Sequence, residues 1–330
     1  MWLAYDGFFL HSEESMKYFP ISDSETLPAL GLGTWKSARG DVGKAVAKAL
    51  EIGYRHIDCA PIYQNEIEVG HALGEALTSG AVNRDELWIT SKLWNNAHAK
   101  KHVRPALEKS LKDLQLDHLD LFLIHWPVLF QPGVIFPKNP EEFLAADAIP
   151  VMETWQEMER MVKKGLCRFI GVCNFNLPRI KELTTQATIK PAMNQIELHP
   201  YLQQVELVEY CRQNKILVTA YSPLGSADRP EAMKKEGEPS LLDHPTIGEV
   251  ARRSKATPAQ VLLTWGLARG TVVIPKSVNP ERQAENLKAA DITLSDTDLQ
   301  AIDGLESGYR FVDGSFFKAG NSPYRDVDFW

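Results

Sequence analysis

The sequence lacks long apolar runs and clusters of basic residues. No stretch approaches the roughly 20 apolar residues of a membrane-spanning helix, and no Lys/Arg run exceeds two residues. The chain has 36 Lys and Arg against 43 Asp and Glu, a formal net charge of −7. Together these features argue against nucleic acid or an anionic membrane as the main partner.

Cysteine is also scarce. The four cysteines show no CxxC pair or regular spacing, which indicates buried free thiols in a reducing cytoplasm; they are Cys59, Cys167, Cys173 and Cys211. The nine histidines include no HExxH motif. His98 and His102 have helical spacing, but two lysines separate them and no acidic ligand is near, so an exposed helical face is expected there and no metal site.

The first 20 residues, MWLAYDGFFLHSEESMKYFP, lack the basic segment of a signal peptide, and Asp6 interrupts their apolar character. A secretory signal is therefore not expected. Met16 is an alternative start, which would make residues 1–15 a vector-derived or weakly ordered extension. We interpret residues 1–16 as an N-terminal extension and, since no linker follows, residues 17–330 as a single domain.

A short apolar run followed by an amphipathic stretch recurs along the rest of the chain. After a small hairpin over residues 17–29, the predicted strands cover residues 30–35, 54–60, 87–94, 119–126, 168–175, 192–198, 217–224 and 271–275. The predicted helices cover residues 41–51, 66–78, 101–114, 152–164, 179–185, 206–214, 246–254, 259–268 and 281–289. Apolar runs of this kind are typical of a parallel sheet buried on both faces.

Eight such units over about 250 residues match the size of a (β/α)8 (TIM) barrel. The alternative is a doubly wound sheet, which needs a glycine-rich turn after its first strand. Gly31-x-Gly33-x-x-Lys36 lacks the third glycine of that turn. The sequence therefore favours an α/β fold of the (β/α)8 type, with an N-terminal hairpin and long loops at the C-terminal face.

Polar or aromatic residues stand at nearly every predicted strand end, and these ends share one mouth in such a barrel. They are Trp35, Asp58, Lys92, Trp94, His125, Trp126, Cys173, Asn174, Gln195, Tyr221, Ser222, Lys276 and Ser277. Each alone has an ordinary structural reading, such as a hydrogen-bonded core histidine or a solvated lysine at the rim. Their convergence on one mouth favours a functional site.

Asp58 and Tyr63 suggest acid–base chemistry at this mouth. A phenol has a reference pKa of about 10 and becomes a useful acid when a nearby cation favours the phenolate. Lys92 can supply that cation if Asp58 holds it beside the phenol, and we expect it to lower the pKa of Tyr63. His125 is placed to hydrogen-bond the same substrate oxygen.

The tryptophans at the rim, Trp35, Trp94 and Trp126, end three predicted strands. For any one of them, ordinary core packing is as good a reading as a binding role. Three at one mouth favour an apolar pocket wall.

Eight motifs in the order of a known family carry a closer resemblance. They are GLGTW (31–35), DCAPIYQNEIEVG (58–70), ITSKLW (89–94), LIHWP (123–127), GVCNF (171–175), NQIELHP (194–200), YSPLGS (221–226) and IPKSVNPERQAEN (274–286). From about residue 17 to residue 310 the chain resembles the aldo-keto reductase superfamily, close to its aldose/aldehyde reductase members. That resemblance implies NADPH-dependent reduction of a small carbonyl substrate by a monomer.

The resemblance also implies residue roles. The matched catalytic tetrad is Asp58, Tyr63, Lys92 and His125, with Tyr63 the general acid that protonates the carbonyl oxygen as NADPH delivers hydride. Tyr221 matches the ring that stacks on the nicotinamide, and Asn174 and Gln195 match the side chains that bind its carboxamide. The implied substrate contacts are Trp35, Tyr63, Trp94, His125 and Trp126.

At the far end of the cofactor, Lys276, Ser277 and Arg282 match the 2′-phosphate site, so NADP(H) is expected over NAD(H). Lys36, Asp228 and Lys276 match positions where an acidic loop residue bridges two lysines over the pyrophosphate. The remaining expected cofactor contacts are Gly33, Thr34, Trp35, Asp58, Cys173, Ser222, Pro223, Leu224, Ser226, Ile274, Pro275, Glu285 and Asn286.

The chain departs from the family in ways that affect binding. Cys173 stands where serine is usual, so we expect modestly altered cofactor binding. Residues 227–234 lack a tryptophan that aldose reductases often place against substrate, and residues 308–330 match only loosely. The resemblance implies that this tail and the loop over residues 127–150 shape the substrate pocket. Two alternatives stay open: a catalytically idle NADP(H)-binding protein on the same barrel, and a sugar dehydrogenase that works mainly in the oxidative direction.

Overall fold

The computed structural model describes residues 17–318 and 320–330, so the predicted extension over residues 1–16 lies outside the described part. Eight parallel strands form one sheet in the order β10-β9-β8-β7-β6-β5-β4-β3. They are β3 (Leu32–Gly33), β4 (His56–Asp58), β5 (Trp88–Leu93), β6 (Leu119–Ile124), β7 (Cys167–Cys173), β8 (Met193–Glu197), β9 (Leu217–Tyr221) and β10 (Val272–Val273).

This sheet closes on itself between β3 and β10. Parallel bridges join Leu30 to Val273 and Gly33 to Lys276, and the Gly33 amide donates to the Pro275 carbonyl at 3.0 Å. A Cβ at Gly33 would lie 2.9 Å from the Ile274 carbonyl oxygen, so only glycine allows this approach. The predicted (β/α)8 barrel is confirmed, and the doubly wound alternative is wrong because that sheet stays open.

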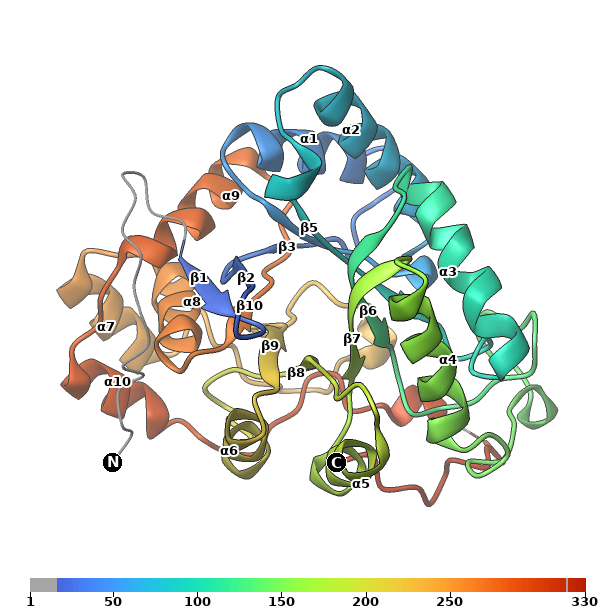
Figure 1. Cartoon of the computed structure of the whole chain (residues 1–330). Coiled ribbons are helices and arrows are strands. Elements are labelled where there is room, and N and C mark those ends of the chain that lie inside the picture. Colours follow the sequence, from blue (N-terminus) through green and yellow to red (C-terminus); the bar gives the residue numbers. More distant parts are fainter. Residues whose placement is uncertain (1–16, 319) are drawn as a thin grey trace.

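Helices surround the strands as an outer ring (Figure 1). They are α1 (Val42–Glu51), α2 (Glu66–Thr78), α3 (Lys100–Leu114), α4 (Val151–Lys163), α5 (Leu177–Gln186), α6 (Val205–Gln213), α7 (Pro245–Ser254), α8 (Pro258–Ala268), α9 (Pro280–Leu287) and α10 (Asp296–Asp303). Helix α10, which is short and begins at a Ser295 cap, was not predicted. The strands are shorter than predicted because the predicted ranges also include buried residues that lie beyond the last hydrogen-bonded residue of each strand.

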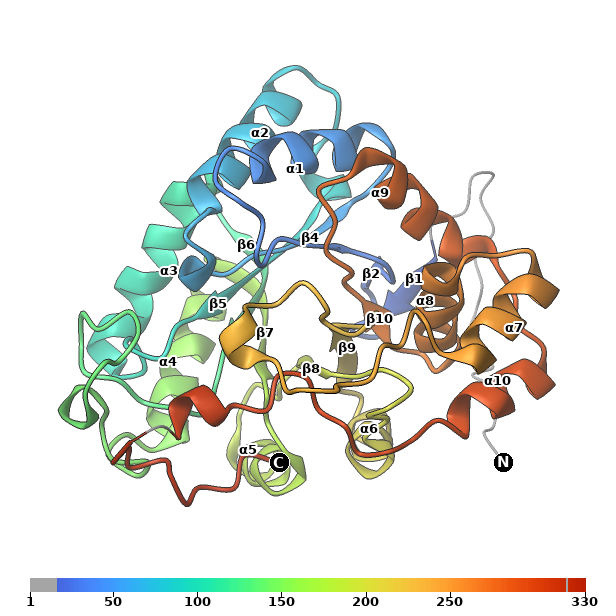
Figure 2. The ribbon, with the colours of Figure 1, turned by 180° about the vertical axis from the view of Figure 1, so that it is seen from behind.

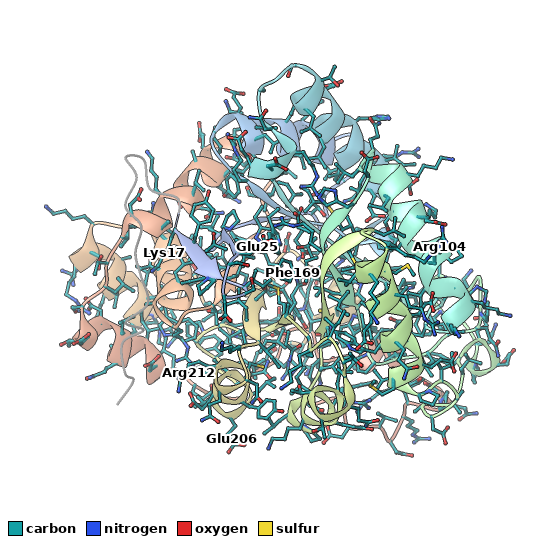
Figure 3. The ribbon with its side chains drawn as sticks, in the orientation of Figure 1. Lys17, Glu25, Arg104, Phe169, Glu206 and Arg212 are labelled. Carbon is teal, nitrogen blue, oxygen red and sulfur yellow. The ribbon has the colours of Figure 1, made fainter. Side chains whose placement is uncertain are left out.

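The predicted N-terminal hairpin is formed by β1 (Tyr18–Pro20) and β2 (Thr26–Pro28). Its turn is tied to the starts of two barrel strands, because Glu25 pairs with Arg168 and Asp23 pairs with Lys215 at 3.0 Å. Glu25 accordingly lies beside Phe169 near the centre of this face in Figure 3. The hairpin therefore covers the N-terminal end of the barrel and leaves the opposite end to the loops.

Buried hydrophobic side chains from Phe19 to Phe329 form one cluster, and the single-domain interpretation stays a prediction. All four cysteines are free and buried, as predicted. The exposed face predicted at His98 is wrong: this side chain is 5% exposed because residues 97 and 98 turn inward before α3. In the described part of the chain, no helix is long and apolar enough to cross a membrane.

Candidate active site

The carboxyl ends of the strands surround a cavity of about 920 Å³. Figure 2 shows this face, with residues 225–242 and the red C-terminal tail passing across it. The predicted site residues that line the cavity are Gly33, Trp35, Lys36, Asp58, Tyr63, Trp94, His125, Trp126, Cys173, Asn174, Gln195, Tyr221, Ser222, Pro223, Leu224, Ser226, Asp228, Ile274, Pro275, Lys276, Ser277, Arg282, Glu285 and Asn286. Thr34 and Lys92, which were also predicted, are buried and do not line the cavity.

Lys92 lies at the centre of the site, with its side chain fully buried. Its ammonium donates to Asp58 Oδ1 at 2.5 Å, to the Cys59 carbonyl at 2.9 Å and to Tyr63 Oη at 3.3 Å. The other carboxylate oxygen, Asp58 Oδ2, accepts from Gln195 Nε2 at 2.7 Å. All three donors of the ammonium and both carboxylate oxygens are thus engaged, as a buried ion pair requires.

The backbone after β4 places the phenol over this ammonium. Ala60 is extended and Pro61 opens a short 3-10 helix (Pro61–Tyr63), which Gln64 ends in a left-handed conformation, φ 56°. Asn65 Nδ2 then donates to the Thr34 carbonyl at 2.9 Å and ties this turn to the strand beside it. A single turn therefore carries Tyr63 from the strand end to the barrel mouth.

Burial raises the pKa of Tyr63 above its ordinary value, and Lys92 acts in the opposite direction. The predicted direction of the lysine's effect is right, but the predicted net lowering is wrong because loss of solvation outweighs it. Burial also acts to lower the pKa of Lys92, yet Asp58 and then Tyr63 outweigh it and the net pKa is raised. At neutral pH the phenol is protonated and the amine is charged.

His125 follows β6, with its ring edge-on to Tyr63 at 5.8 Å between centroids and to Trp94 at 5.1 Å. Burial, followed by the charges of Lys92 and His98, lowers the pKa of His125 well below its usual range. The imidazole is therefore neutral. Its Nδ1 is buried and has no hydrogen-bond partner among the described residues.

The residues expected at the nicotinamide form a connected network. Tyr221 Oη donates to Asn174 Oδ1 at 2.7 Å, and Asn174 Nδ2 donates to the His125 carbonyl at 2.9 Å. Asn174 has φ 61° and Ser222 has φ 49°, a left-handed conformation uncommon outside glycine. The Cys173 thiol faces Gln195 Oε1 at 3.9 Å, and its expected effect on cofactor binding stays a prediction.

The opposite end of the cavity is rich in cations. Asp228 forms ion pairs with Lys36 and, at 3.4 Å, with Lys276. Arg282 lies in the first turn of α9, where the Asn279 side chain accepts from its amide at 3.0 Å. Two of these cations are thus bridged by one half-exposed loop carboxylate, while Arg282 is exposed.

Two segments expected to shape the substrate pocket contribute an apolar part of the cavity wall, but the residues that form it were not predicted. Phe316 lies 5.7 Å from Trp126 and 6.1 Å from Phe136 between ring centroids, and Phe136 and Phe316 both line the cavity. These residues belong to a loop and the tail, where no periodicity indicates which side chains point inward. The other lining residues that were missed are Ile62, Gly225, Ala227, Pro230, Met233, Leu242, Asp243, Thr257, Pro258, Ala259, Val278, Asn279 and Val312.

Fold and cavity together define a (β/α)8 barrel with an acid–base cluster at the carboxyl ends of its strands. The model of the Aldo/keto reductase family matches residues 29–307, and the chain belongs to that family, as predicted. Membership makes the protein an oxidoreductase that acts on carbonyl groups.

The chain is similar to several named members of this family. It is 54% identical over 316 residues to "Aldo/keto reductase slr0942" of Synechocystis sp., covering 96% of this chain and 97% of that protein. "Aldo-keto reductase family 1 member A1" of Sus scrofa is 46% identical over 294 residues, covering 88% and 90%. The Gallus gallus protein of the same name is 44% identical over 297 residues, covering 89% and 90%.

Proposed function

We propose that this protein reduces aldehydes, and some ketones or aldoses, to alcohols with NADPH. One observation carries the proposal: the Lys92 ammonium lies 2.5 Å from Asp58 and 3.3 Å from a phenol that faces the cavity. A protonated phenol beside a fixed cation can donate a proton to a carbonyl oxygen and stabilise the alkoxide that develops there. Family membership supports a nicotinamide cofactor.

The residues present fit NADP(H). Lys36, Lys276 and Arg282 line one end of the cavity, where they would hold the phosphates. Asn174, Gln195 and Tyr221 line the other end, where they would hold the nicotinamide. The cofactor supplies the hydride when it is bound.

The protein's own part in the reaction is to orient the carbonyl and supply a proton. Tyr63 holds that proton on Oη, and Lys92 favours its departure because the ammonium stabilises the phenolate left behind. Neutral His125 orients the substrate oxygen beside the phenol. The apolar wall that includes Trp35, Trp94 and Trp126 excludes water from the reacting atoms.

The pH dependence of reduction should reflect these two pKa shifts. The pKa of His125 is lowered, so this residue stays neutral at pH values well below the usual histidine pKa of about 6.5. The pKa of Tyr63 is raised, so the phenol keeps its proton at pH values above the usual tyrosine pKa of about 10. We expect kcat/KM for an aldehyde, at saturating NADPH, to be flat from about pH 6.5 to 9.5. It should fall only at higher pH, as Tyr63 ionises. A break near pH 6.5 would show that His125 titrates there, against this expectation.

Selectivity between the two cofactors should depend on Arg282. Removing one charged hydrogen bond to the 2′-phosphate costs about 1.5–3 kcal/mol, so Arg282→Gln should weaken NADPH binding about 10- to 150-fold. NADH lacks that phosphate, and its affinity should stay within about twofold. Fluorescence titration with both cofactors measures the change. The control is Lys288→Gln, since Lys288 is an exposed cation of the same region that does not line the cavity. Equal losses of affinity for NADPH and NADH in Arg282→Gln would rule out a contact between Arg282 and the 2′-phosphate.

The ion pairs of Asp228 should slow cofactor release. Its carboxylate joins the loop over residues 225–242 to Lys36 and Lys276 across the cavity. Asp228→Asn removes both ion pairs, and we expect NADPH to dissociate about tenfold faster, corresponding to about 1.4 kcal/mol. Stopped-flow measurement of release tests this, with Glu236→Gln as an exposed control in the same loop. Unchanged release in Asp228→Asn would refute closure of the loop by this residue.

Loss of NADPH absorbance with a panel of aldehydes, ketones and aldoses tests the proposed function, with NADH run in parallel. We expect turnover with aldehydes and a preference for NADPH. Binding of NADPH without turnover would support the catalytically idle alternative. The reverse assay, alcohols or sugars with NADP⁺, tests the dehydrogenase alternative. Monomeric state and cytoplasmic location stay predictions.

A further inference from the structure

Part of the cavity wall comes from a segment with no regular structure of its own. Between α10 and the 3-10 helix η6 (Ser315–Phe317) the described chain forms no helix or strand. Val312 from this irregular part of the C-terminal tail and Phe316 from η6 both line the cavity. In Figure 2 the red tail runs along the lower edge of this face, next to the loop over residues 225–242. Since no backbone ladder holds it, the position of the tail depends on individual anchoring contacts.

One carboxylate provides such an anchor. Glu197 ends β8 and is 0% exposed. Its Oε1 accepts from the Phe311 amide at 2.6 Å, and its Oε2 accepts from the Val312 amide at 2.8 Å. Each carboxylate oxygen therefore binds one of two successive backbone amides of the tail. These two hydrogen bonds fix the position of the tail relative to β8 at the point where Val312 enters the cavity wall.

The surroundings of Glu197 make this anchor stable. His199 Nε2 lies 2.8 Å from Glu197 Oε1, and the guanidinium of Arg310 is close enough to interact with the carboxylate. Arg310 in turn lies 3.6 Å above the ring of Trp330. A buried carboxylate needs such partners, and it loses stabilisation when a donor is removed.

Glu197 itself is not part of the cavity surface. In the sheet it is paired with Tyr221, which lines the cavity, whereas Glu197 does not. Its charge acts on Tyr221 beside it, and its hydrogen bonds act on the cavity wall through the tail. The wall that the tail completes is aromatic, because Phe316 packs against Trp126 and Phe136.

We propose that Glu197 is a positioning residue that sets the substrate wall and thereby determines selectivity for bulky aromatic aldehydes over short aliphatic ones. A bulky aromatic aldehyde reaches the wall formed by Phe316, whereas a short aldehyde contacts only the groups around the tetrad. This inference rests on the proposed reductase function and extends it to a residue outside the cavity.

The variant that tests it is Glu197→Gln. The amide keeps one acceptor oxygen but turns an NH₂ group toward a backbone N–H, so at least one tail contact is lost. With NADPH saturating, we expect kcat/KM for a bulky aromatic aldehyde to fall about tenfold, equivalent to about 1.4 kcal/mol. The value for propanal should stay within about twofold, and most of the loss should lie in KM.

Glu159→Gln is the matched control. Glu159 on α4 is also a buried carboxylate, 5% exposed, and its Oε1 accepts from the Thr188 and Ile189 amides at 2.8 Å each. It does not line the cavity. Because one oxygen accepts both amides, the amide oxygen of Glu159→Gln can keep both contacts. This control removes a buried negative charge away from the cavity, and its ratio of the two kcat/KM values should equal that of the wild type.

Hydrogen exchange provides a readout that does not depend on catalysis. The Phe311 and Val312 amides should be protected in the wild type, exchange at least tenfold faster in Glu197→Gln and keep their protection in Glu159→Gln. Unchanged exchange would overturn the anchoring role. Faster exchange with an unchanged selectivity ratio, or equal losses for both aldehydes, would overturn the role in selectivity.

Phe316→Ala covers the case in which Glu197→Gln does not fold. It leaves the anchor intact and removes the wall, so it should lower the same ratio about tenfold. An unchanged ratio in Phe316→Ala would overturn the proposal. If the wild type reduces neither aldehyde, the proposed function itself fails; turnover by the wild type together with an unchanged ratio in the variants defeats only this inference.

Discussion

Tyr63→Phe is expected to lower kcat/KM for aldehyde reduction about 10³-fold, within the 10²- to 10⁴-fold contribution typical of a positioned acid. The substitution removes one oxygen and the 3.3 Å contact with Lys92. Lys92 keeps its contacts with Asp58 and the Cys59 carbonyl, so the site should stay assembled. NADPH affinity, measured by fluorescence titration, should stay within about twofold of the wild type.

Tyr54→Phe is the control for this prediction. Tyr54 is also fully buried, and its hydroxyl donates to the Gln283 carbonyl at 3.0 Å outside the cavity. Its loss should cost about 1 kcal/mol of unfolding free energy and leave kcat unchanged. If Tyr63→Phe kept more than a tenth of wild-type activity, the phenol would not be the proton donor.

Removing one partner of the Asp58–Lys92 pair is expected to lower the free energy of unfolding by about 3–5 kcal/mol, because the remaining charge is left buried without its partner. This applies to Asp58→Asn and to Lys92→Met, since both side chains are almost completely buried. The double variant should lose less than the sum of the single losses, by about 2–3 kcal/mol. Urea unfolding of all four proteins measures the coupling, and all three variants should lose most of their activity.

The exposed pair on α3 serves as the reference for this cycle. Arg104 and Glu108 are 2.7 Å apart with side chains 50% and 46% exposed, and the coupling of such a pair is about 0.3–0.5 kcal/mol. Strict additivity of the losses at Asp58 and Lys92 would mean that the two charges do not stabilise each other, and the buried ion pair would then have no role in holding Lys92 beside Tyr63.

The barrel could be predicted because its signals are local and repeated. Each apolar run is long enough to mark a buried strand, and the predicted ranges contain the observed β3 to β10 except for the first residue of β7, Cys167. The closure between β3 and β10 depends on contacts between residues about 240 positions apart, such as Leu30 and Val273. Only the count of eight units indicated it, and α10 was missed because it is short.

Much of the site could be predicted for a similar reason. Asp58, Lys92 and Gln195 stand on strands, whose ends meet at one mouth in any parallel barrel. The net pKa of Tyr63 could not be predicted, since it depends on how completely loops bury the phenol. Phe136, Phe316 and the contacts of Glu197 with the tail were missed because they depend on segments without periodicity.

The most direct test of a reductase that uses Tyr63 as its acid is transfer of deuterium to an aldehyde from NADPH with deuterium at both positions of nicotinamide C4, followed by mass spectrometry of the product. We expect an alcohol with one deuterium on its carbinol carbon, formed by the wild type and nearly absent with Tyr63→Phe. Bound NADPH that transfers no deuterium, or equal product from both proteins, would contradict this mechanism.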